Sequence, residues 1–164
     1  MDLKRIIETL GLQPHPEGGH FAEIWRADER IDAANLPGRY GGDRNFGTAI
    51  YYLLGPDDVS AMHRITSDEI FHFYLGDPVE QLHLMPDGSH RVVEIGPDLA
   101  AGQRPQVIVP RGVWQGARVK PGGRFALMGT TVAPGFDFAD FEMGDATALS
   151  AEWPDAAGMI GLLK

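Results

Sequence analysis

The chain has 164 residues, 14 Lys and Arg against 23 Asp and Glu, a net charge of −9, and no cysteine. The acidic balance argues against nucleic-acid binding, which needs clustered cations to neutralise phosphates, and the lack of cysteine excludes disulfides and thiolate metal sites. No window approaches 18 apolar residues, and the first residues form a helical pattern and not a signal peptide. We therefore expect a cytoplasmic protein with no membrane contact, folded as a single domain over residues 1–164.

The N-terminal part of the chain predicts a helix and a strand separated by a rigid turn. Residues 2–10 carry apolar side chains at helical spacing, with an Asp cap before them and a glycine after them. Residues 12–19 contain two prolines and two glycines, which favour a turn, and residues 20–26 alternate like a strand. Residues 27–45 are polar and predict a long surface loop. Its length is typical of a mobile or functional segment.

The remainder of the chain is dominated by short strand patterns. Residues 48–54 give the strongest of them, and a hairpin is predicted over residues 79–95. Further strands are predicted at residues 106–109, 113–119 and 124–132. The tail is too apolar to stay unpacked and is expected to pack back as short helices; its large apolar residues are Phe136, Phe138, Phe141, Trp153, Met159 and Ile160. About eight short strands punctuated by turns favour an all-β sandwich or jelly roll, with helices only at the ends.

Residues 62–76 hold the chemically versatile side chains of the chain. Two strand-like runs flank a polar bend there, and they carry His63, Glu69 and His72. If the two runs pair as a hairpin, His63 lies opposite Glu69 and both side chains share one face. An acid and an imidazole on one face are suited to a ligand pocket. The alternative is a hydrogen-bonded polar pair within the core.

The alternation after Glu69 predicts which neighbours share that pocket. Phe71 and Phe73 fall on the same face as Glu69, whereas His72 falls on the opposite face. We therefore predict ligand contacts from Phe71 and Phe73. For His72 two interpretations stay open, a pocket residue or a histidine at an outer face or subunit contact.

Other histidines and one glutamate leave similar alternatives. Three interpretations stay open for His15 and Glu17, which are an N-terminal latch, a lid over the pocket, or simply a rigid Pro/Gly turn. We expect His20, His83 and His90 at the surface or at a strand edge.

Several motifs in the sequence resemble those of the cupin superfamily. The spacing His63-x5-Glu69-x6-Gly76 resembles the first cupin motif, and Pro110-x-Gly112-x-x-Gln115 resembles the second. Four longer segments resemble one small cupin family of mostly uncharacterised proteins; they are residues 15–23, 67–73, 109–115 and 132–138. Together they extend over nearly the whole chain, and four segments in register are a specific signal.

The resemblance implies a double-stranded β-helix jelly roll, usually dimeric, with a small-molecule pocket inside the barrel. Cupins that bind metal hold the ion with His, His, Glu and His. Here Ile65 and Gln115 stand at two of those positions, so only His63 and Glu69 remain. Because a transition metal wants three or four strong side-chain ligands, we predict no tightly bound metal and no other cofactor. Weak divalent binding through His63, Glu69, Gln115 and water stays open.

Three functions are compatible with these residues. The first is a metal-independent isomerase or epimerase acting on a sugar or nucleotide sugar, by analogy with epimerases of the same fold, with His63 as base and Glu69 as its partner. The second is a ligand-binding or sensing module without turnover, in which Gln115 and the aromatic residues orient the ligand. The third is a metal-dependent enzyme. The expected partners are a small-molecule ligand and a second copy of the chain.

Overall fold

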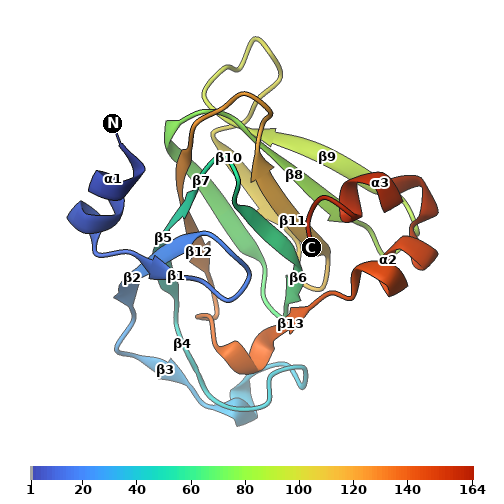
Figure 1. Cartoon of the computed structure of the whole chain (residues 1–164). Helices are drawn as coiled ribbons and strands as arrows, with labels where there is room; N and C mark the ends of the chain where they lie inside the picture. The colour runs from blue at the N-terminus through green and yellow to red at the C-terminus, as the bar shows by residue number, and fades with distance from the viewer. Residues whose placement is uncertain (1) are drawn as a thin grey trace.

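The computed structural model describes residues 2–164, and two antiparallel β-sheets face one another in it (Figure 1). The six-stranded sheet has the order β1 (Gln13–Pro14), β2 (His20–Arg26), β5 (Thr48–Leu54), β12 (Ala126–Val132), β7 (Glu69–Gly76) and β10 (Gln106–Val109). The five-stranded sheet has the order β13 (Phe141–Met143), β6 (Val59–Ile65), β11 (Trp114–Val119), β8 (Val79–Leu84) and β9 (His90–Ile95). Apolar residues of both sheets form one core between them. This arrangement confirms the predicted jelly roll.

Short helices stand at both ends of the chain, as predicted. Helix α1 (Leu3–Leu10) is capped by the Asp2 side chain and ends at Gly11 in the left-handed conformation. It packs on the outer face of the six-stranded sheet. Helices α2 (Ala146–Glu152) and α3 (Ala157–Ile160) cover the five-stranded sheet (Figure 1). No helix among residues 2–164 is long and apolar enough to cross a membrane.

The predicted pairing of the two runs in residues 62–76 is wrong. Strand β6 pairs with β11 and β13, whereas β7 pairs with β12 and β10, so residues 66–68 cross from one sheet to the other. A short polar bend between two alternating runs is compatible with a hairpin or with a change of sheet, and the jelly roll uses the second. His63 and Glu69 consequently approach one another from facing sheets. The hairpin predicted over residues 79–95 is confirmed, with Val79 opposite Ile95.

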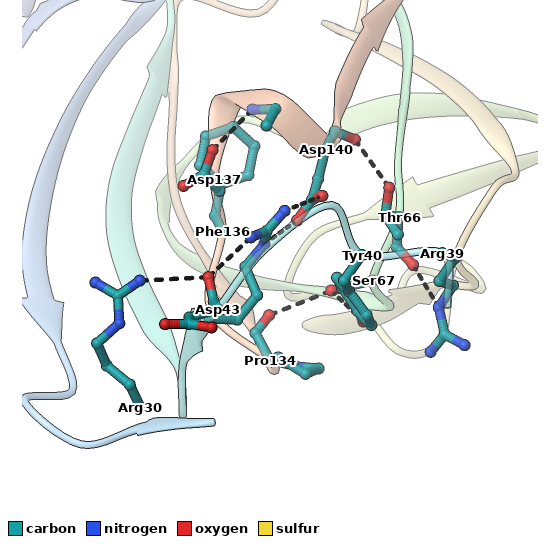
Figure 2. Close-up of polar contacts among 12 residues, drawn as sticks. Arg30, Arg39, Tyr40, Asp43, Thr66, Ser67, Pro134, Phe136, Asp137 and Asp140 are labelled. Carbon is teal, nitrogen blue, oxygen red and sulfur yellow. Dashed lines mark hydrogen bonds and ion pairs between the residues drawn. The ribbon is translucent and has the colours of Figure 1, made fainter. Parts of the chain in front are cut away.

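The segment predicted as a surface loop, residues 27–45, is anchored at its C-terminal end. It contains the two-residue strands β3 (Arg30–Ile31) and β4 (Arg44–Asn45) and a 3₁₀ turn, η1 (Ala33–Asn35). Arg44 is buried and binds both carboxylate oxygens of Asp140 at 2.6 and 2.7 Å. Tyr40 is also buried, and its hydroxyl lies 2.8 Å from Ser67 Oγ (Figure 2). The first contact joins the loop to Asp140, just before β13, and the second joins it to the crossing at residues 66–68.

Candidate functional site

A cavity of about 260 Å³ lies between the two sheets. Its apolar wall includes five phenylalanines, which are Phe21, Phe71, Phe136, Phe138 and Phe141. Its polar wall includes Glu17, His63 and Glu69, all less than 10% exposed. The cavity therefore combines an aromatic enclosure with buried titratable groups, as small-molecule sites commonly do.

His63 and Glu17 form a buried pair that holds a proton. The Nδ1 atom of His63 lies 2.8 Å from the carbonyl oxygen of Ala61, which can only accept, so Nδ1 carries hydrogen. The Nε2 atom lies 3.2 Å from Glu17 Oε2, and Ser60 Oγ donates to Glu17 Oε1 at 2.8 Å. The Nε2–Oε2 contact requires one further proton, held on the imidazole or on the carboxyl group.

The turn before β2 places Glu17 in the cavity wall. The Ala61 amide donates to the Glu17 carbonyl at 2.8 Å, and the Tyr52 hydroxyl donates to the Gly18 carbonyl at 2.9 Å. His15 packs edge-on against Phe21 within the same turn. Burial lowers the pKa of His15 and so favours its neutral form. His15 and Glu17 both line the cavity, and they do so from within the Pro/Gly turn.

Glu69 reaches the cavity from the opposite wall, at the start of β7. Its Oε2 atom accepts a hydrogen bond from Gln115 Nε2 at 2.7 Å. Burial raises the pKa of Glu69 above its ordinary value, and this effect outweighs the attraction of nearby His63. The carboxyl group therefore keeps its proton to a higher pH than an exposed glutamate.

The other predicted ligand contacts lie in different places. Phe71 lines the cavity, whereas Phe73 points into the barrel but packs against the hydrophobic core, which fills the interior beyond Phe71. His72 is outside the cavity, as strand alternation requires, and its Nε2 lies 3.0 Å from Thr131 Oγ1. Gln115 reaches Glu69 from β11 of the facing sheet and is not among the residues that line the cavity. Phe73, His72 and Gln115 are therefore not among the residues that line the cavity, whereas His63, Glu69 and Phe71 are; the contacts of all six with a ligand stay predictions.

Some residues of the site escaped sequence reasoning. Tyr52 and Thr130 line the cavity from β5 and β12, and alternation within each strand gave no sign of which face would enclose a ligand. Phe136, Phe138 and Phe141 were expected to support packed helices but close the cavity instead. Their clustering after a Pro-Gly break was the available signal. His83, expected at the surface or a strand edge, is fully buried because it faces the interior between the two sheets, on the same side of β8 as the core residue Val79.

The donors present do not fit a transition-metal centre. Ile65 lines the cavity with a hydrocarbon side chain, and both nitrogens of His63 are already engaged. Within residues 2–164, no three His, Asp or Glu side chains are grouped so as to hold a metal ion. The absence of a tightly bound metal stays a prediction, which elemental analysis of untagged, dialysed protein decides.

Comparison with solved structures supports the same fold. The chain is similar to a protein of Shewanella oneidensis, with 34% identity, a TM-score of 0.89 and coverage of 100% of this chain and 98% of that one. A hypothetical protein from Leishmania major gives 29% identity, a TM-score of 0.89 and coverage of 99% and 98%. Oxalate decarboxylase from Bacillus subtilis shares the fold alone, with 12% identity and a TM-score of 0.54 over 92% of this chain and 36% of that one.

Comparison with protein sequences extends the likeness to nearly the full length. An uncharacterised protein of Saccharomyces cerevisiae is 29% identical over 98% of this chain and 85% of its own length. A family model described as Cupin superfamily (DUF985) matches residues 4–144, which include every strand of both sheets and the residues of the cavity. The chain belongs to this DUF985 family of the cupin superfamily.

Proposed function

We propose that the protein binds a small uncharged carbonyl compound, such as a sugar, in its cavity and moves protons on it without a metal. The observation that carries this proposal is the meeting of three buried titratable groups in one cavity. The Glu17–His63 pair stands on one wall, with 3.2 Å between Oε2 and Nε2, and the buried acid Glu69 stands on the other. An acid and a base on opposite sides of a ligand are what an epimerase or isomerase requires.

The two walls divide the chemistry between them. With the shared proton on the His63 imidazole, the Glu17 carboxylate takes a proton from the carbon next to the ligand carbonyl, and the electron pair of that C–H bond moves onto the carbonyl oxygen. Glu69 then gives its proton to the opposite face of the same carbon, which inverts it, or to the neighbouring oxygen. The raised pKa of Glu69 favours this role, since a proton donor must still be protonated near neutral pH. Solvent restores both groups after release.

The charges of the wall favour an uncharged ligand. Arg26 is the only Lys or Arg among the lining residues, all of which lie in the described part of the chain, and its guanidinium is bound to Glu23 at 2.7 and 2.9 Å. A phosphate or a nucleotide diphosphate therefore finds no uncommitted cation beside the acids. The volume also lies just under the range of about 300–1,000 Å³ typical of drug-sized ligands. A free sugar fits these limits better than a nucleotide sugar.

Hydrogen exchange with solvent tests the proposal directly. Neutral aldoses, ketoses and hydroxyketones are incubated with the protein in deuterated water, and loss of the C–H proton next to the carbonyl is followed by NMR. We expect exchange with the wild type and a loss of about 100-fold or more in Glu69→Gln and His63→Gln. His72→Gln is the matched control, because His72 lies outside the cavity, and it should exchange normally.

A thermal-shift series with the same compounds separates turnover from binding. A compound present at about 100 times its dissociation constant stabilises the folded state by about 2.7 kcal/mol. Stabilisation that is lost in Glu69→Gln, without any exchange in the wild type, would assign the cavity to a binding module. Neither stabilisation nor exchange with any member of the series would contradict the proposed ligand class.

A further inference from the structure

A line of buried hydrogen bonds runs from β9, at the edge of the five-stranded sheet, to Glu69. Arg91 Nε donates to His83 Nδ1 at 3.2 Å, and His83 Nε2 lies 2.9 Å from Gln81 Oε1. Gln81 Nε2 donates to Gln115 Oε1 at 2.9 Å, and Gln115 Nε2 donates to Glu69 Oε2 at 2.7 Å. His83, Gln81 and Gln115 are each no more than 1% exposed. Apart from Glu69, none of these side chains takes part in the proposed reaction.

The direction of every bond in this line is fixed at its outer end. A guanidinium can only donate, so Nδ1 of His83 must accept and its proton must sit on Nε2. The Nε2–H group of His83 donates to Gln81 Oε1, so the amide nitrogen of Gln81 is the atom that faces Gln115. Gln81 Nε2 donates to Gln115 Oε1, and the amide nitrogen of Gln115 therefore faces Glu69. All four bonds therefore donate toward Glu69. Such aligned bonds strengthen one another in a low-dielectric interior.

We propose that Arg91, His83 and Gln81 are positioning residues that act through Gln115 to orient the carboxyl group of Glu69. Because Oε2 accepts a hydrogen bond from Gln115, and the unprotonated oxygen of a carboxyl group is the better acceptor, this bond favours the acid proton of Glu69 on Oε1. Gln115 reaches Oε2 from β11 of the facing sheet and does not line the cavity, so we assign Oε1 to the ligand. The line does not conduct protons, since the two amides in it have no readily transferable proton. It holds an orientation.

The functional meaning of this line rests on the proposed role of Glu69 as a proton donor. The direction of its hydrogen bonds can be measured without any ligand. The ring-nitrogen NMR shifts of His83 distinguish a proton on Nε2 from one on Nδ1. We expect the Nε2–H tautomer in the wild-type protein, assigned by the loss of its signals in His83→Gln. An Nδ1–H tautomer would mean that the line runs in the opposite direction and would overturn the proposal.

Two variants of Arg91 with side chains of matched length test the outer end. In Arg91→Gln, the amide nitrogen occupies the bonded position of the Arg Nε and can donate, whereas in Arg91→Met a methyl group stands there. Arg91 is exposed, so both variants are expected to fold. We expect His83 to stay Nε2–H in Arg91→Gln and to populate Nδ1–H in Arg91→Met. Reversal of the line then turns the Gln115 carbonyl toward Glu69, which should move the carboxyl titration of Glu69, followed by carbon NMR, to higher pH.

The pair of variants also separates direction from charge, because both remove the positive charge of Arg91. If the titration of Glu69 moves equally in both, the charge of Arg91 is responsible and the proposed positioning is refuted. If it moves only in Arg91→Met, the direction of the line is responsible. If the wild-type protein exchanged no ligand hydrogen with solvent, the proposed function would be refuted. The tautomer of His83 would still test the direction of the line.

Discussion

At the scale of single residues, the buried histidine of β8 should make stability depend on pH. Burial, with a smaller contribution from the charge of Arg91, lowers the pKa of His83 from 6.5 to about 4. As the pH falls, His83 therefore binds a proton near pH 6.5 in the unfolded chain but only near pH 4 in the folded protein. The free energy of unfolding should fall as the pH is lowered through this window, by about 3 kcal/mol for this one group.

Urea denaturation between pH 4 and 7 measures this dependence. In His83→Gln the titrating group is gone, so the fall in stability across the window should be smaller by about 3 kcal/mol. His90→Gln is the control, since His90 is exposed at the start of β9, and it should behave like the wild type. Equal slopes in all three proteins would show that His83 titrates normally. His15 and His72, whose pKa values burial also lowers, contribute in the same sense to every curve.

At the scale of elements, the turn that carries Glu17 depends on one glycine. Gly18 has φ = 108°, and a Cβ built there would collide with the Val59 carbonyl oxygen of β6. In Gly18→Ala we expect a loss of about 1–3 kcal/mol or more in unfolding free energy, and a displaced Glu17. Gly122→Ala shares the positive φ, 88°, but meets no neighbour within 4 Å, so it isolates the backbone strain. Equal losses of unfolding free energy in the two variants would show that the turn does not pack against β6.

The anchor of the loop at residues 27–45 is a second element-scale contact. Arg44 and Asp140 are 96 residues apart in sequence, and each side chain is only 5% exposed. Arg44→Met leaves a buried carboxylate unpaired and should cost about 3–5 kcal/mol, whereas the double variant Arg44→Met with Asp140→Leu should recover most of it. Lys4→Met, which breaks an exposed pair with Glu8, should change stability by less than about 1 kcal/mol. A double variant no more stable than Arg44→Met would point to a loss of packing instead.

These elements also show what local sequence can predict. Strand β5 and the β8–β9 hairpin were predicted correctly because alternation and turn residues are local signals. The partners of β6 and β7 were not, since the choice of sheet depends on strands far along the chain. The same limit applies to the site. The motif identified His63 and Glu69, but the seating of Glu17 on β6 and the line from Arg91 exist only in the folded chain.

At the scale of the whole molecule, the outer face of the six-stranded sheet is the place where we expect a second copy to bind. Helix α1 covers one part of this face, over Leu53 and Leu127. An uncovered row crosses the sheet in register; it consists of Trp25, Ala49, Thr131, Ile70 and Ile108. Trp25 and Ile108, at its two ends, are 50% and 56% exposed. A self-complementary apolar row of this kind suits a two-fold dimer, which would also protect the edge strand β10.

Light scattering coupled to size exclusion measures the mass at micromolar concentration, and we expect that of a dimer. Ile108→Glu places a charge in the row and should yield a monomer with an unchanged fold, because a buried unpaired carboxylate opposes association but costs nothing on an exposed strand. Val92→Glu is the matched control, since Val92 is 48% exposed but lies on β9 of the other sheet. A wild-type monomer would remove the prediction altogether. A dimer broken by Val92→Glu and kept by Ile108→Glu would move the interface to the five-stranded sheet.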